Sequence, residues 1–153
     1  MKGRTATEKI ELRLPGVAAL GVRLLGKAPG PVRRRALRRA FARAEAAFNR
    51  GDFDALFALF ADDVEYVPPP ALSEEPIQGK PDLLRFWNDV LRRYPEGEIT
   101  NLDLEEAEPN RFTRTLRVIH RARDEQRLRY DLRQTTELER GRVVRQVNRA
   151  LLS

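Results

Sequence analysis

Four consecutive segments in the second half of this chain alternate polar and apolar residues, and only short turns separate them. The segments span about residues 97–107, 111–123, 127–139 and 142–152. The turns between them are Pro109–Asn110, Asp124–Glu125–Gln126 and Arg140–Gly141. Because successive side chains of a strand point to opposite faces of a sheet, this alternation predicts strands joined by hairpins. A run of hairpins that follows helices indicates an α+β fold.

Three helical segments precede these strands. Apolar residues recur at helical spacing over residues 31–49, and Gly51 follows as a stop signal. Asp52 is placed to cap a second, short and largely apolar helix. A brief strand at Val64–Val67 comes next, and Pro81 opens the third helix. The predicted fold is a cone-shaped α+β domain, with three N-terminal helices packed on a curved antiparallel (mixed) sheet.

The parity of the residue number assigns strand side chains to the two faces of this sheet. Even-numbered positions are mainly apolar, whereas odd-numbered positions carry Arg117, Arg121, Arg129, Asp131, Arg133, Arg145 and Arg149. The even-numbered face is therefore expected to lie under the helices. Turns centred on Glu125 and Gly141 predict the cross-strand pairs His120–Tyr130, Val118–Leu132, Leu116–Gln134, Leu138–Val144, Thr136–Gln146 and Gln134–Asn148.

Residues 1–30 differ from the rest of the chain, because proline and glycine interrupt them repeatedly. The interruptions are Pro15, Gly16, Gly21, Gly26, Pro29 and Gly30. They leave room for at most one helical stretch, at about residues 17–26. We expect two parts, an N-terminal appendage over residues 1–30 and a cone-shaped domain over residues 31–153.

The composition excludes several classes of site. The chain has no cysteine and one histidine, which excludes disulfides, thiolate metal sites and multi-histidine clusters, and we expect neither a metal nor a cofactor. The most apolar run, Val17–Leu25, is interrupted by Gly21 and Arg23 and is too short to span a membrane. It is also a poor secretory signal, which favours a cytoplasmic protein.

Positive charge gathers in the first third of the chain. Residues 1–50 carry 13 Lys and Arg against 3 Asp and Glu, a balance of +10 in a chain whose net charge is +6. The Arg33–Arg43 face of the first predicted helix could therefore bind an anionic partner such as nucleic acid or a membrane surface. It lacks a nucleic-acid-reading motif and interleaved aromatic residues, so a solvated helix face is favoured.

A polar minority interrupts the apolar even-numbered face. Its members are Arg114, His120, Tyr130, Gln134, Thr136, Gln146 and Asn148. Burying any of them without a partner would cost about 1–3 kcal/mol. They gather in three adjacent strands, as the convergent polar groups of a small-molecule pocket do. With aromatic residues closing the cavity, the predicted ligand-binding residues are Tyr66, Phe86, Trp87, Arg114, Tyr130, Gln134, Gln146 and Asn148.

Two members of this set carry charge or titrate. His120 is the candidate catalytic acid or base, because histidine titrates near neutral pH, and a structural role near the hairpin end is the alternative. Arg114 could bind an acidic ligand or form an ion pair with Glu106 or Glu108, of which the ion pair is favoured.

The segment Ala46–Val64, with the sequence AAFNRGDFDALFALFADDV, resembles the opening of the nuclear transport factor 2-like superfamily, and its SnoaL-like and steroid isomerase-like branches are the most similar. The similarity continues through Ile77–Pro81 and Phe86-Trp87 and ends in the Gly141–Val144 hairpin. It covers about residues 33–152. The resemblance implies the cone fold, a small-molecule pocket and a homodimer formed through the outer sheet surface.

The branches of this superfamily imply different activities. A steroid isomerase-like site would need a tyrosine and two aspartates where this chain has Ala44, Pro68 and Gln134, so that mechanism is rejected. A polyketide cyclase-like site would match His120, but its acid position holds Gln134, which cannot exchange a proton. An epoxide hydrolase-like site would match Tyr66, without an evident Asp–Arg–Asp arrangement.

We therefore expect a small-molecule-binding SnoaL-like protein. If it is an enzyme, it is a cofactor-independent isomerase, cyclase or hydrolase that acts on a small, largely apolar substrate. The first alternative is a non-catalytic ligand-binding or dimerisation module. The second is the anionic partner of the basic helix described above.

Overall fold

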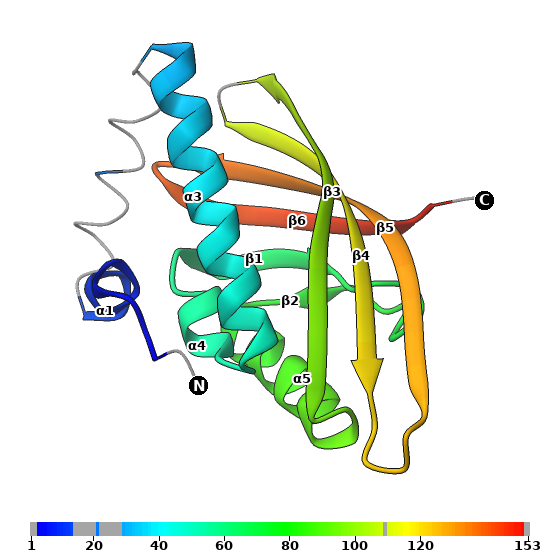
Figure 1. Cartoon of the computed structure of the whole chain (residues 1–153). Coiled ribbons are helices and arrows are strands. Elements are labelled where there is room, and N and C mark those ends of the chain that lie inside the picture. Colours follow the sequence, from blue (N-terminus) through cyan, green and yellow to red (C-terminus); the bar gives the residue numbers. More distant parts are fainter. Residues whose placement is uncertain (1–2, 14–20, 22–28, 109, 152–153) are drawn as a thin grey trace.

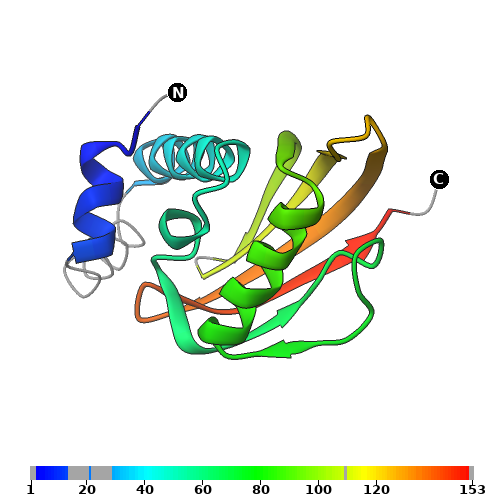
Figure 2. The ribbon, with the colours of Figure 1, turned by 90° about the horizontal axis from the view of Figure 1, so that it is seen from below.

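The structure is a computed structural model that describes residues 3–13, 21, 29–108 and 110–151. Its helices are α1 (Ala6–Arg13), α3 (Gly30–Asn49), α4 (Phe53–Leu56) and α5 (Lys80–Arg93). Its strands are β1 (Phe60–Val67), β2 (Ile77–Gln78), β3 (Glu96–Glu108), β4 (Arg111–Arg121), β5 (Arg127–Glu139) and β6 (Arg142–Ala150). Helices α3, α4 and α5 lie on the concave side of a strongly curved sheet (Figures 1 and 2). The predicted α+β cone is confirmed.

The sheet has the strand order β2-β1-β6-β5-β4-β3. Strand β1 runs parallel to β6, and every other neighbouring pair is antiparallel. Strand β1 is longer than predicted, because Phe60 already pairs with Val143 of β6. Helix α4 is correspondingly short, and Asp52 caps it as predicted by accepting a hydrogen bond from the Ala55 amide at 3.3 Å.

The register between β4 and β5 differs from the prediction by two residues. Val118 pairs with Tyr130, and His120 pairs with Leu128, so the predicted His120–Tyr130, Val118–Leu132 and Leu116–Gln134 pairs are wrong. The turn is centred one residue earlier than predicted, and its Ala122 amide donates to the Gln126 carbonyl at 2.9 Å. A shift of two residues preserves the faces, since side chains alternate with a period of two.

A bulge changes the faces at the start of β6. The predicted pairs Thr136–Gln146 and Gln134–Asn148 are confirmed, but Leu138 pairs with Val143 instead of Val144. The extra residue reverses the parity locally. Val143 is consequently buried in the core, and the predicted inward position of Val144 is wrong.

An aromatic cluster joins the helices to the sheet. Phe48 of α3 packs against Phe53, Trp87 and His120, with ring centroids 5.6 to 6.1 Å apart. Strand β3 approaches α3 so closely that a Cβ at Gly97 would lie 3.0 Å from the Phe48 ring. A side chain at this position would require the Phe48 ring or strand β3 to shift by a few tenths of an ångström.

The N-terminal appendage contains a helix, α1, that the sequence analysis did not predict. The stretch 17–26 that it favoured lies, apart from residue 21, outside the described residues. Helix α1 begins with a reciprocal cap, since the Thr5 amide donates to Glu8 Oε2 at 2.6 Å and the Glu8 amide donates to Thr5 Oγ1 at 3.2 Å. The Thr5-x-x-Glu8 spacing is visible in the sequence and was the signal for this helix.

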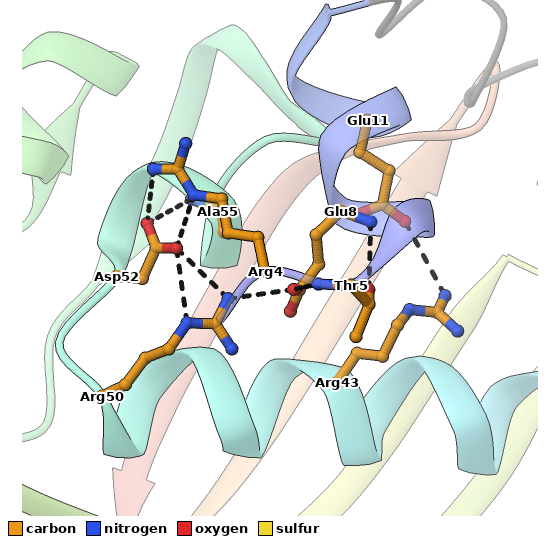
Figure 3. A network of polar contacts seen from close by, with 8 residues as sticks. All are labelled: Arg4, Thr5, Glu8, Glu11, Arg43, Arg50, Asp52 and Ala55. Atoms are coloured by element: carbon orange, nitrogen blue, oxygen red, sulfur yellow. Dashed lines mark hydrogen bonds and ion pairs between the residues drawn. The ribbon is translucent and has the colours of Figure 1, made fainter. Parts of the chain in front are cut away.

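Ion pairs attach the appendage to the cone (Figure 3). Arg4 Nε lies 2.7 Å from Asp52 Oδ2, and Arg50 Nη2 lies 3.0 Å from Glu8 Oε2. Glu8 is 2% exposed, and the pKa of Asp52 is lowered to about 2, chiefly by its hydrogen bond with Arg4. Among the described helices, none is long and apolar enough to cross a membrane.

Candidate functional site

A cavity of about 160 Å³, here called the cone cavity, lies between the helices and the concave face of the sheet. Most of its wall is apolar, and this part includes Phe41, Phe57, Leu116, Val118 and Leu132. Its volume is close to that of an engineered apolar cavity of about 150 Å³ that binds benzene. The space therefore suits a molecule of about one aromatic ring.

Seven of the eight predicted ligand-binding residues line the cone cavity, namely Tyr66, Trp87, Arg114, Tyr130, Gln134, Gln146 and Asn148. Phe86 is not part of the wall. It packs edge-on against Trp87, with ring centroids 5.5 Å apart. Adjacent positions on a helix point in different directions, so α5 turns Trp87 toward the sheet and Phe86 elsewhere. Ligand contact by these residues stays a prediction.

Three of these side chains form a chain of hydrogen bonds across β4, β5 and β6. Arg114 Nε donates to Gln134 Oε1 at 2.7 Å, and Gln134 Nε2 donates to Asn148 Oδ1 at 2.9 Å. Asn148 Nδ2 then donates to the Val67 carbonyl of β1 at 2.9 Å. These hydrogen bonds fix the orientation of both side-chain amides. They turn the Gln134 oxygen toward the Arg114 guanidinium.

Arg114 is 7% exposed, and its Cζ atom lies 4.6 Å from the centroid of the Phe41 ring. Its Nη1 atom is buried and forms no hydrogen bond. Burial lowers the pKa of Arg114 to about 10, so the side chain stays protonated at neutral pH. The predicted ion pair with Glu108 is not formed, because Glu108 is exposed and pairs with Arg111 in the sheet. The side chain of Glu106 lies outside the described part of the chain.

Two further polar pairs lie in the wall. Trp87 Nε1 donates to the Tyr66 hydroxyl at 3.2 Å, and Gln146 Nε2 donates to Thr136 Oγ1 at 2.9 Å. Tyr66 is 2% exposed, and burial raises its pKa above the usual range. Its hydroxyl group is therefore a neutral hydrogen-bonding group at physiological pH.

His120 is buried behind the wall and is absent from the residues that line the cone cavity. Its Nε2 atom is hydrogen-bonded to the Tyr130 hydroxyl at 2.8 Å, and the rings of Phe48, Trp87 and Tyr94 surround it. Burial lowers the pKa of His120 to about 4, so the imidazole is neutral near pH 7. A catalytic role for His120 stays a prediction, and Tyr130 is its connection to the cavity.

The chemistry available in the cone cavity is hydrogen bonding and positive charge. Its described lining residues include one cation, the buried Tyr66, the half-buried Tyr130 and three side-chain amides, and no carboxylate. The pKa of Tyr130, like that of Tyr66, is raised by burial. Across the described residues, no group of three or more His, Cys, Asp or Glu side chains could hold a metal ion.

A second cavity of about 210 Å³, here called the α1 cavity, lies between α1, α3 and the near end of the sheet. Glu8, Glu11 and Arg43 contribute charged groups to its wall, and burial raises the pKa of Glu11. It shares Ala40, Ala44 and Leu56 with the cone cavity, so the two spaces are neighbours. Sequence reasoning missed this cavity because it did not predict α1.

The remaining charged candidates lie on the surface. Asp131 forms an ion pair with Arg117 at 3.0 Å on the outer face, as the parity of the strands predicts. The basic face of α3 is divided, since Arg33 and Arg43 line the α1 cavity. The exposed arginines of this face are Arg34, Arg35, Arg38 and Arg39.

Comparisons with known proteins place the chain in one family. The model of the SnoaL-like domain family matches residues 34–146. No curated protein sequence matches the chain. Solved structures do match it, at identities below 25% that show the fold alone.

Three of these structures are representative. An NTF2-like protein of unknown function from Burkholderia pseudomallei is 18% identical, with 74% of this chain and 89% of that chain covered and a TM-score of 0.64. TerC, co-crystallised with polyporic acid, is 14% identical, with 74% and 89% covered and a TM-score of 0.62. IdmH of Streptomyces antibioticus, a candidate polyketide cyclase, is 16% identical, with 74% and 90% covered and a TM-score of 0.60. The chain therefore belongs to the SnoaL-like domain family and has the NTF2-like fold.

Proposed function

We propose that this protein binds a small, largely apolar molecule in the cone cavity. The observation that carries this proposal is the buried chain of hydrogen bonds from Arg114 through Gln134 to Asn148. An apolar core gains nothing from such a chain, whereas a binding site needs a few oriented polar groups in an apolar wall. The volume and the mostly apolar lining support the same proposal.

The comparisons support it at the level of the fold. A structure with this fold was co-crystallised with a small organic molecule, polyporic acid, and another belongs to a candidate polyketide cyclase. If this protein is an enzyme, we propose a cofactor-independent isomerase, cyclase or hydrolase. Tyr130 would then contact the substrate, and His120 would accept or supply its proton through their 2.8 Å hydrogen bond. The alternative is a binding protein without catalysis.

The binding proposal is tested by titrating the full chain with benzene and recording methyl resonances by NMR. We expect chemical-shift changes at Leu116, Val118 and Leu132, whose side chains line the cone cavity. The exposed side chains of Val32 and Leu151 serve as internal controls and should not shift. Changes confined to the controls, or no changes at all, would contradict the proposal.

The homodimer implied by the family resemblance is also a proposal. The outer face of the sheet supplies acidic partners to its own arginines, since Arg133 Nη2 lies 3.0 Å from Glu105 Oε2 and Arg117 Nε lies 3.0 Å from Asp131 Oδ1. This pairing reduces the repulsion between two such faces. Sedimentation velocity should show a dimer, and a monomer at all concentrations would contradict it.

A further inference from the structure

We propose that the ligand of the cone cavity is an organic anion, a carboxylate on an apolar body of about one aromatic ring, whose oxygen is held by the guanidinium of Arg114. This inference rests on the proposed binding function and adds the charge of the ligand. It follows from the state of Arg114, the hydrogen bonds that orient it and the composition of the wall.

Arg114 is a buried cation that forms no ion pair with any residue the structure describes. Its side chain is 7% exposed, yet its hydrogen-bond acceptor is a neutral amide oxygen, that of Gln134. Burying a charge is costly unless an opposite charge accompanies it. Glu45 is the carboxylate that acts on Arg114 most strongly, but it does not pair with the guanidinium, and its Oε1 accepts a hydrogen bond from the backbone amide of Asn101 at 3.0 Å. The guanidinium therefore lacks a directly paired carboxylate, and Glu45 offsets its charge only from a distance.

The orientation of the guanidinium leaves a donor for a ligand. Nε is committed to Gln134, and Phe41 covers one face of the group at 4.6 Å. Because a guanidinium donates hydrogen bonds in its own plane, the ring at its face takes none of its donors. The Nη1 atom of Arg114 is buried and has no hydrogen-bond partner. Arg114 is one of the residues that line the cavity. A carboxylate oxygen would satisfy both the free donor and the charge.

A neutral carbonyl group would satisfy only the donor. The described wall adds no negative charge that would repel an anion, because its ionisable groups other than Arg114 are tyrosines whose pKa is raised by burial. Apart from the three amides and Thr136, the rest of the wall is apolar and includes Leu116, Val118 and Leu132. The site therefore combines a single cationic end with space for a ring.

The test compares benzoate with benzamide, which have nearly the same shape and differ in charge. Dissociation constants are measured on the full chain by NMR titration. We expect benzoate to bind at least about tenfold more tightly than benzamide, since a charge-assisted hydrogen bond is roughly twice as strong as a neutral one. Arg114→Met should abolish this preference. Arg117→Met, which removes an arginine from the outer face of the same strand, is the matched control and should keep it.

Gln134→Glu provides a second variant that retains the arginine. The new carboxylate would take the place of the amide oxygen that lies 2.7 Å from Arg114 Nε. The protein itself would then supply the negative charge that pairs with Arg114. We expect the affinity for benzoate to fall at least about tenfold and that for benzamide to change less than about twofold. This variant keeps the test valid if Arg114→Met fails to fold.

The outcomes separate the two proposals. Equal binding of benzoate and benzamide, or a preference for benzoate that survives both Arg114→Met and Gln134→Glu, would overturn the anion site and leave the binding function in place. Failure of benzene, benzoate and benzamide alike to bind would overturn the binding function and this inference with it.

Discussion

Arg114 is a buried cation on the inward face of β4, between two apolar residues. The neighbouring inward positions of the strand are Phe112 and Leu116, and both are buried. Gln134 and Asn148 are likewise amides among apolar side chains, joined by a 2.9 Å hydrogen bond. Residues that lower the stability of the free protein are common in binding sites. A ligand supplies the charge or the hydrogen bond that such residues lack when the site is empty.

Arg114→Met should therefore stabilise the free protein. Removing a buried cation that forms no ion pair with a described residue, at the loss of one hydrogen bond to Gln134, is expected to raise the free energy of unfolding by about 1–2 kcal/mol. Urea denaturation followed by circular dichroism measures the change. Arg117→Met, whose ion pair with Asp131 lies on the solvent-exposed face of the sheet, should leave the free energy of unfolding nearly unchanged. Destabilisation by Arg114→Met would mean that the arginine serves the fold.

His120 gives the protein a predictable sensitivity to acid. Its pKa is lowered to about 4 in the folded chain, whereas an unfolded histidine titrates near 6.5. Between these values the unfolded state binds more protons, so stability falls as the pH falls. The full difference corresponds to roughly 3 kcal/mol.

The measurement is the free energy of unfolding from pH 7.5 to pH 4, compared with that of His120→Gln. Glutamine can keep a hydrogen bond to Tyr130 but cannot titrate. We expect the variant to lose less stability than the original chain over this range, and the difference isolates His120 from the carboxylates. Parallel curves would show that His120 is not buried in its neutral form.

Among the elements, the strands were predictable because the alternation of polar and apolar residues shows which side chains face the core and which face solvent. Gln134 and Asn148 were expected to face each other, and they do. The register at the β4–β5 turn was not predictable, because alternation is unchanged by a shift of two residues. The bulge before Leu138 was hidden for a related reason, since both Val143 and Val144 are apolar and either could face the core.

Helix α1 illustrates a signal that was present but outweighed. Thr5 and Glu8 have the spacing of a reciprocal cap, yet the prolines and glycines that follow suggested an irregular segment. What no local pattern could give is the docking of this helix, which depends on Arg50 and Asp52 far along the chain.

Glu8→Ala should release α1 from the cone. The substitution removes both the cap at Thr5 and the ion pair with Arg50, and hydrogen exchange of the amides of residues 6–13 should accelerate at least about tenfold. Exchange in β4 and β5 should be unchanged. Lys9→Ala, on the exposed side of the same helix, is the control. Equal exchange in the two variants would mean that Glu8 does not anchor α1.

For the whole molecule, the cone shape was implied by the family resemblance, and the inward face of the sheet followed from the alternation of polar and apolar residues in its strands. The separation of His120 from the cavity did not, since it depends on how Phe48 and Trp87 pack around the ring. Phe86 likewise needed the rotation of α5 about its axis, which a helical pattern rich in apolar residues leaves open.

The wall between the cone cavity and the α1 cavity limits the size of the ligand that the cone cavity can hold. It consists of Ala40 and Ala44, which are as small as side chains with a Cβ can be, and of Leu56 on a four-residue helix. That helix is capped by Asp52, which Arg4 holds from the appendage. Shortening Leu56 would therefore thin the wall that the two cavities share, and a relative with a smaller residue at this position would have a longer cavity while the cone itself stayed the same.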